Sequence, residues 1–259
     1  MKNFLYTLII ASIAFVNCFA NKNCNLSEYN LKPLHNKLAT LENQIITEYK
    51  KTELNPESSE KFAKIFQKTI QENPETLNYP FKKLLEETNI YIITSSDGRL
   101  RFYSWDNHSG GTMRFFDQII QFADNGKVIV TLKIATDDSQ SFISKIYSMK
   151  TNKNVTIYFT INNSILSSSL VMQSIFSYTI NKNKLNTTKI FKTKKQFLSA
   201  INCEFDFFSV VDRPERPVEL IKIKNKRLQI PLINEKGTVT NKNLIYKWNG
   251  SYFIYEGIK

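Results

Sequence analysis

The residues closest to a catalytic set lie around His108, one of only two histidines in the chain. The run Trp105-Asp106-Asn107-His108-Ser109-Gly110-Gly111 supplies a carboxylate, an imidazole and a hydroxyl. A hydrolytic triad needs the imidazole within hydrogen-bond reach of both other groups, and adjacent residues of one turn seldom achieve this. Glycine and asparagine are typical turn formers. The sequence therefore predicts a turn, with a hydrolase that uses His108 as the alternative.

A metal site is not expected. Zinc needs three or four convergent histidine, cysteine or carboxylate ligands. The chain has two histidines and three cysteines, and His35 has no neighbouring ligand in its predicted helix. We expect no metal and no cofactor, and we assign no catalytic residue.

A pair of carboxylates, Glu204 and Asp206, lies in the alternating segment Cys203-Glu204-Phe205-Asp206-Phe207-Phe208. On a strand the two would share one face, about 6–7 Å apart. Glycosidases use carboxylates at a similar separation, but usually from different strands across a cleft. Pairing with a lysine or arginine on the neighbouring strand is the expected role.

Two arginines, Arg213 and Arg216, lie in the rigid loop Asp212-Arg213-Pro214-Glu215-Arg216-Pro217. Because the charges alternate, ion pairs within the loop are expected. The alternative is that the two guanidinium groups form a fork for a carboxylate or phosphate. Both arginines are therefore candidate binding residues.

A binding face is also expected on a hairpin over residues 99–118. Period two places Arg101, Tyr103 and Trp105 on one face of its first strand. With a loop at 106–111, Trp105 would lie opposite Thr112 and Tyr103 opposite Arg114. Arginine, tyrosine and tryptophan are the residues most enriched in binding hot spots. The alternative is that the N-terminal helices or another sheet cover this face.

These residues must be positioned by two kinds of structure. Apolar residues at helical spacing predict an N-terminal helical segment over 21–88, with Asn55-Pro56 opening one helix and Asn73-Pro74 ending it. From residue 89 the pattern changes to period two, and Asp97-Gly98, Asn125-Gly126 and Asn249-Gly250 are tight-turn signals. The expected strands are 90–94, 99–105, 112–122, 127–134, 154–161, 169–180, 184–191, 203–211, 218–224, 227–233, 244–248 and 251–255.

This order predicts an α+β, mainly β fold. A helical segment would pack on a large antiparallel β-sheet system over 89–259, either sandwich-like or as an irregular, partial propeller. No linker rich in proline, glycine or serine marks a boundary near residue 89. We therefore interpret that point as a change of structural class.

Residues 1–20 have the pattern of a signal peptide. Lys2 precedes an apolar run that extends to Val16, and Cys18-Phe19-Ala20 supplies small residues before a cleavage point. The alternatives are an uncleaved anchor and a lipoprotein modified on Cys18. Of the cysteines, Cys24 and Cys203 would remain after cleavage. They are a candidate disulfide in an oxidising compartment, with a buried free thiol at Cys203 as the alternative.

The net charge of +12 is concentrated in one part of the chain, because residues 139–203 hold nine lysines and no Asp or Glu. An acid-free basic surface would attract an anionic partner, whereas a solvated lysine-rich face is the expected role. Lysines 189, 192, 194 and 195 surround Phe191 and Phe197. Aromatic and basic residues of this kind can bind single-stranded nucleic acid. The sequence has no recognisable oligonucleotide-binding motif, however, and we expect no nucleic-acid partner.

Two segments carry a resemblance. The first is Ser96-Asp97-Gly98-Arg99-Leu100-Arg101-Phe102-Tyr103-Ser104-Trp105-Asp106, which continues to Gly110-Gly111-Thr112-Met113; the second is Phe205-Asp206-Phe207-Phe208-Ser209-Val210-Val211-Asp212-Arg213-Pro214-Glu215-Arg216-Pro217-Val218. Together they resemble a group of uncharacterised exported bacterial proteins. The resemblance implies export and carries no activity across.

We therefore expect an exported, non-enzymatic binding or interaction protein in the periplasm or at the cell surface. Its partner would be a protein or an anionic ligand of the bacterial envelope, and no transmembrane segment is expected in the mature chain. The alternatives are an exported hydrolase with an unidentified site and an envelope inhibitor or immunity protein.

Overall fold

The computed structural model describes residues 26–135 and 141–259. The predicted signal peptide and Cys24 lie outside these ranges. Two compact units are distinguished, Met1–Leu41 and Glu42–Lys259. The change from helices to strands near residue 89 therefore lies inside the second unit.

The helices follow the predicted apolar spacing. They are α2 (Leu26–Leu54), α3 (Ser59–Glu72) and α4 (Lys82–Glu87), with short 3-10 turns η1 (Pro56–Ser58) and η2 (Pro74–Leu77) between them. Prolines begin both 3-10 turns, where the missing N–H costs no hydrogen bond. In the second unit, the buried carboxylate of Glu42 accepts hydrogen bonds from the Tyr79 hydroxyl (2.9 Å) and the Leu84 amide (2.8 Å).

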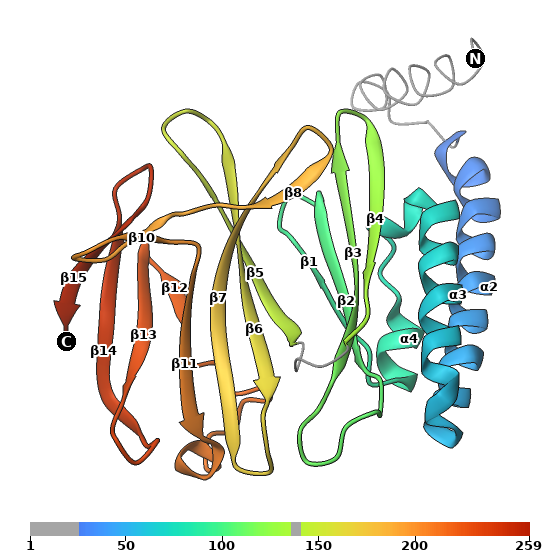
Figure 1. The fold of residues 1–259 in the computed structure, drawn as a ribbon. Helices are drawn as coiled ribbons and strands as arrows, with labels where there is room; N and C mark the ends of the chain where they lie inside the picture. The colour runs from blue at the N-terminus through green and yellow to red at the C-terminus, as the bar shows by residue number, and fades with distance from the viewer. Residues whose placement is uncertain (1–25, 136–140) are drawn as a thin grey trace. The chain divides into compact units, whose positions relative to one another are not determined.

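Three sheets follow, and in Figure 1 they lie in successive layers with α3 and α4 on the outer face of the first. The first sheet has the order β1-β2-β3-β4, the second β11-β7-β6-β5 and the third β10-β9-β15-β14-β13-β12. All pairings among these are antiparallel except that of β9 with β15. The α+β, mainly β class predicted from the sequence is confirmed.

The strand bounds are as follows. The first sheet contains β1 (Tyr91–Thr94), β2 (Leu100–Asp106), β3 (Phe116–Asp124) and β4 (Lys127–Lys133). The second contains β5 (Phe142–Lys150), β6 (Thr156–Ile165), β7 (Leu170–Asn181) and β11 (Ala200–Asp206), with β8 (Lys184–Thr187) paired to β7. The third contains β9 (Phe191–Lys192), β10 (Phe197–Leu198), β12 (Lys222–Lys224), β13 (Arg227–Ile233), β14 (Val239–Trp248) and β15 (Phe253–Ile258).

Two apolar clusters join the layers. Phe159 and Ile161 of β6 pack with Phe191 and Phe253, so one face of the second sheet is buried against the third. Tyr158, from the opposite face of β6, packs with Leu100, Phe102, Ile120 and Phe122 of the first sheet. The second sheet is therefore the central layer, and its strands β5, β6 and β7 supply side chains to both interfaces.

The predicted binding face on β2 is wrong, because helices cover it. Arg101, Tyr103 and Trp105 are 5%, 0% and 0% exposed. Trp105 meets Phe62 of α3 edge to face at 5.3 Å, and Tyr103 meets Phe66 in the same way at 5.2 Å. The rings of Tyr103 and Trp105 therefore belong to the hydrophobic core. This matches the alternative in which the N-terminal helices cover this face.

The guanidinium of Arg101 is satisfied by the backbone beneath the helices. It donates to the carbonyl oxygens of Thr76 and Tyr79, both at 2.6 Å, and to the Thr94 hydroxyl at 2.6 Å. Tyr103 donates to the Gln121 side chain at 2.8 Å, and burial raises the pKa of its hydroxyl to about 12. These contacts stabilise the helical layer on the first sheet.

The register of the hairpin also differs from the prediction. Trp105 pairs with Asp117 and Tyr103 with Ile119, because the connecting loop runs to residue 115 and β3 begins at Phe116. Arg114 therefore lies in the loop rather than on a strand.

Cys203 is a free, buried thiol on β11 within the core between the second and third sheets. This is the buried-thiol alternative considered for Cys203. Cys24, its candidate disulfide partner, lies outside the described residues.

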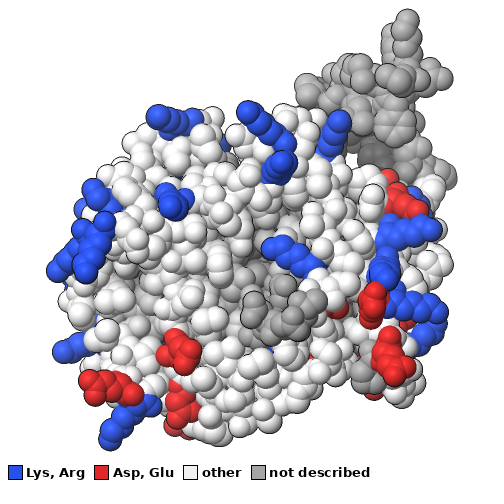
Figure 2. Space-filling view, viewed as in Figure 1, with Lys and Arg blue, Asp and Glu red and all other residues white. Residues whose placement is uncertain are grey.

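The lysines of residues 139–203 lie on several different segments. They are distributed over β5, the turns that follow β5 and β7, and the segment around β9, and Figure 2 shows basic side chains at several separate points of one face. Lys145 forms an ion pair with Glu219 at 2.6 Å. Among the described helices, none has the length and apolar character needed to span a membrane.

Candidate ligand-binding site

An apolar cavity lies at one end of the second sheet. It has a volume of about 470 Å³, within the range of small-molecule sites. Its walls come from the loop between β2 and β3, the turn between β6 and β7, the 3-10 helix η3 (Phe207–Val210) and the loop that follows η3. The two loops and the segment that begins with η3 are far apart in the sequence and lie together along the lower edge of Figure 1.

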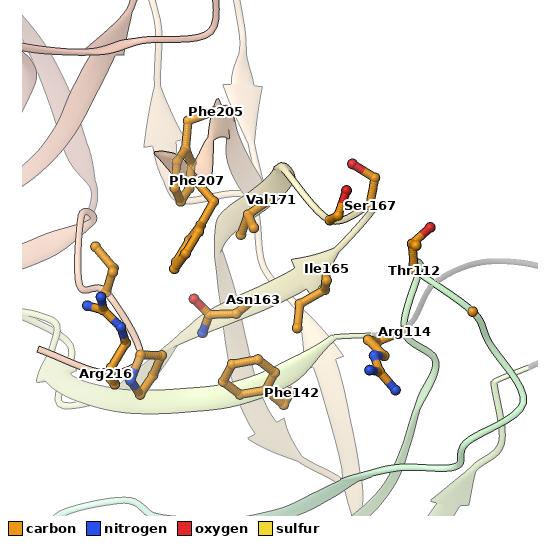
Figure 3. Close-up of a pocket in the computed structure, with 14 residues that line it drawn as sticks. Thr112, Arg114, Phe142, Asn163, Ile165, Ser167, Val171, Phe205, Phe207 and Arg216 are labelled. Carbon is orange, nitrogen blue, oxygen red and sulfur yellow. The ribbon is translucent and has the colours of Figure 1, made fainter. Parts of the chain in front are cut away.

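The walls are aromatic and branched aliphatic side chains, shown in Figure 3. Ile165 at the end of β6 pairs with Val171 at the start of β7, which in turn pairs with Phe205 of β11. Phe142 of β5 and Phe207 of η3 complete the apolar lining. The row across adjacent strands follows from alternation, because residues paired across strands share a face.

One buried amide, Gln173 of β7, holds the loop that closes the cavity. Its Oε1 accepts from the amides of Leu220 (2.9 Å) and Ile221 (2.7 Å), and its Nε2 donates to the carbonyl of Val218 (2.8 Å). Nε2 also donates to Asn163 Oδ1 at 2.7 Å. Gln173 is 1% exposed, so the loop is attached to the sheet by hydrogen bonds that water does not screen.

Arg216 and Arg114 lie on opposite sides of the cavity in Figure 3. The guanidinium of Arg216 donates to the carbonyls of Glu215 (2.8 Å), Val211 (2.7 Å) and Arg213, and lies over the Phe207 ring at 5.6 Å. Among the residues that the structure describes, these bonds leave Nε–H and one further N–H without an acceptor. The ion pairs expected within the loop are not formed among the described residues, because backbone carbonyls take the donors of Arg216.

Arg114 is held by the loop that carries it. Its backbone amide donates to the Ile165 carbonyl at 3.0 Å, which attaches the loop to the end of β6. Its Nη1 donates to Asp106 Oδ2 at 3.2 Å, and the side chain is 46% exposed. The other guanidinium N–H groups have no acceptor among the described residues and are available to a ligand beside the apolar wall.

Exposed apolar residues flank the cavity. Met113 is next to Arg114, Phe208 next to Phe207, and Val211 supplies a carbonyl to Arg216. Their exposures are 37%, 62% and 42%. Large exposed side chains of this kind are expected where an apolar molecule enters.

The loop around His108 does not form a triad. His108 Nδ1 lies 4.0 Å from Asp106 Oδ1, but the Ser109 hydroxyl donates to Asn107 Oδ1 at 2.7 Å rather than facing the imidazole. Asp106 Oδ1 accepts from the His108 amide, and His108 has a positive φ of 59°. The residues act as turn formers, as expected from their types.

The other sequence candidates lie outside the cavity. Asp206 caps η3 by accepting from the Phe208 amide at 3.0 Å, and neither Asp206 nor Glu204 forms the expected cross-strand ion pair within the described residues. Arg213 is exposed and does not line the cavity. Lys192 lies over the rings of Phe197 (5.8 Å) and Tyr252 (5.7 Å), away from this site.

Of the six predicted binding residues, the structure brings only Arg114 and Arg216 to one cavity. The apolar lining residues were not predicted, because alternation alone does not distinguish a cavity wall from a packed core. Within the described part of the chain, His, Cys, Asp and Glu do not gather in threes as a metal would require. Comparison with family models, with curated proteins and with solved structures finds no match to this chain.

Proposed function

We propose that this chain is a non-enzymatic binding protein that takes an amphipathic carboxylate into the cavity between Arg114 and Arg216. The observation that carries the proposal is the pairing of an apolar cavity with two guanidinium groups on its opposite sides. The apolar body of the ligand would pack on Phe142, Val171 and Phe207. Its carboxylate would accept hydrogen bonds from the free N–H groups of Arg114. The free N–H groups of Arg216 would lie at the far side of the cavity.

Binding rather than catalysis is supported by the chemistry of the lining. Its titratable side chains are the two arginines, which remain protonated and cannot exchange protons with a substrate. Acyl or glycosyl transfer needs a nucleophile or an acid–base pair at the reacting atoms. The signal peptide predicted for residues 1–20 supports placing this binding activity in the bacterial envelope.

Calorimetric titration with decanoate and with decanol tests the proposal, because the two share an apolar chain and differ in charge. We expect both to bind the wild-type protein, with decanoate about tenfold tighter through its carboxylate. Arg114→Gln should remove that advantage and leave the decanol affinity unchanged.

Arg99→Gln is the matched control, because Arg99 is also half exposed (44%) and paired with one aspartate, Asp124, at 3.4 Å. It does not line this cavity. Failure of the wild-type protein to bind either compound, or equal losses in the two arginine variants, would overturn the proposal.

A further inference from the structure

A second cavity lies on the opposite face of the same strands, between the second sheet and the first. Its volume is about 260 Å³. Asn162 and Ser164 of β6 line it, whereas Asn163 and Ile165 line the apolar cavity. The alternation of one strand therefore supplies two cavities of different character.

The second cavity is lined by amides and hydroxyls. Asn162, Ser174 and Asn202 form one row across three strands, since Ser174 pairs with Asn162 of β6 and with Asn202 of β11. Gln118 of β3 faces this row from the first sheet. These groups include both donors and acceptors, which matches the hydroxyls of a polyol.

Two of the hydroxyls have no protein partner. Ser164 and Ser174 are 4% and 3% exposed, and neither side chain forms a hydrogen bond with any residue that the structure describes. Both line the cavity. Neither oxygen is among the fully buried polar atoms that lack a partner, so both hydroxyls reach the open space of the cavity and can bond a molecule there.

An aromatic wall adjoins the polar row. Phe176 and Tyr178 of β7 lie nearly parallel, with ring centroids 6.3 Å apart and planes 20° apart. Both line the cavity, together with Phe102 of β2. The electron-rich face of an aromatic ring attracts polarised C–H groups such as those of a sugar ring.

Among its described lining residues, the cavity has one charged side chain, the exposed Lys133, and no carboxylate. A single solvated ammonium at the rim contributes little to binding. An uncharged ligand therefore fits these residues better than an anion.

We propose that the second cavity binds one ring of a neutral saccharide. Its hydroxyls would exchange hydrogen bonds with Asn162, Ser164 and Ser174, and its C–H face would pack on Phe176 or Tyr178. This site is separate from the apolar cavity and does not depend on the function proposed there.

Saturation-transfer NMR with glucose and with N-acetylglucosamine on the full-length protein tests the proposal. We expect transfer from the wild-type protein to at least one of these sugars. Ser174→Leu fills the cavity and Asn202→Leu removes an amide from the exposed end of the row, so each should weaken the signal at least tenfold. Asn202 is exposed, which keeps the test valid if Ser174→Leu fails to fold.

Two control variants test which cavity binds the sugar and whether the charge of Lys133 contributes. Val171→Trp fills the apolar cavity on the other face and should leave the sugar signal unchanged, as should Lys133→Gln. Absence of transfer to both sugars in the wild-type protein would overturn the proposal and leave a cavity filled by water alone. Transfer that persists in both Ser174→Leu and Asn202→Leu, or that disappears in Lys133→Gln, would also contradict it.

Discussion

Asn162 and Asn163 are consecutive residues of β6 whose side chains line different cavities on opposite faces of one sheet. Both amides are also fixed by the protein: Asn162 donates to the Ser141 hydroxyl at 2.9 Å and Asn163 to the Ser144 hydroxyl at 2.8 Å. The central sheet is thus the common wall of both candidate sites, and its side-chain order determines their shape.

Gln173→Leu should lower the free energy of unfolding by about 3 kcal/mol. The substitution leaves the buried amides of Leu220 and Ile221 and the carbonyl of Val218 without partners, and each such group costs roughly 1–3 kcal/mol with partial relaxation. Urea denaturation measures the change. Gln196→Leu is the control, because Gln196 is exposed and its side chain holds no loop; a similar loss in both variants would contradict the role given to Gln173.

Arg101→Met should lower the free energy of unfolding and leave ligand binding unchanged. It removes the donor to the Thr76 and Tyr79 carbonyls beneath the helices, which should cost roughly 2–4 kcal/mol in urea denaturation. Arg99→Met removes a half-exposed ion pair with Asp124 and one hydrogen bond to the Ala123 carbonyl, and should cost about 1 kcal/mol or less. Equal stability of the two variants would mean that Arg101 is not buried and would restore it as a surface residue.

The Cys203 thiol should be nearly inert in the native protein. Burial raises its pKa from an ordinary 9.0 to about 12, so at pH 8 the thiolate population falls about a thousandfold. Because the folded state holds the proton more tightly, this contribution to stability is complete below pH 9 and is lost as the pH rises toward 12.

Reaction of unreduced protein with a thiol reagent checks this. We expect negligible labelling of Cys203 at pH 8 in the native state and rapid labelling in urea. If Cys203 remained unlabelled in urea and became reactive only after reduction, it would be in a disulfide, and the free-thiol assignment would be wrong.

Much of the secondary structure follows from the sequence, with two instructive exceptions. The helices and most strands obey their periods, but β5 was not predicted because a bulge between Ile143 and Lys145 interrupts its alternation. The loop after β2 was predicted too short, since Gly110-Gly111 indicates a turn but not where pairing resumes. The resulting register is shifted, and Arg114 lies in a loop.

The predicted binding face on β2 was wrong because both faces of this strand are buried. In β2, Leu100 and Phe102 face the second sheet while Arg101, Tyr103 and Trp105 face the helices. Alternation alone does not reveal that a face with arginine is covered. The lining of the apolar cavity comes from loops and from strands β5, β6, β7 and β11, which meet only in three dimensions, so it could not be assembled from local pattern.

An amide chemical-shift titration with decanoate tests most directly whether the apolar cavity binds an amphipathic carboxylate. We expect the largest shifts at Arg114, Ile165, Val171 and Phe207, around the apolar cavity, and we expect Val171→Trp to abolish them. Shifts confined to other exposed apolar residues, such as Phe197 or Ile258, or no saturable shifts at all, would contradict it.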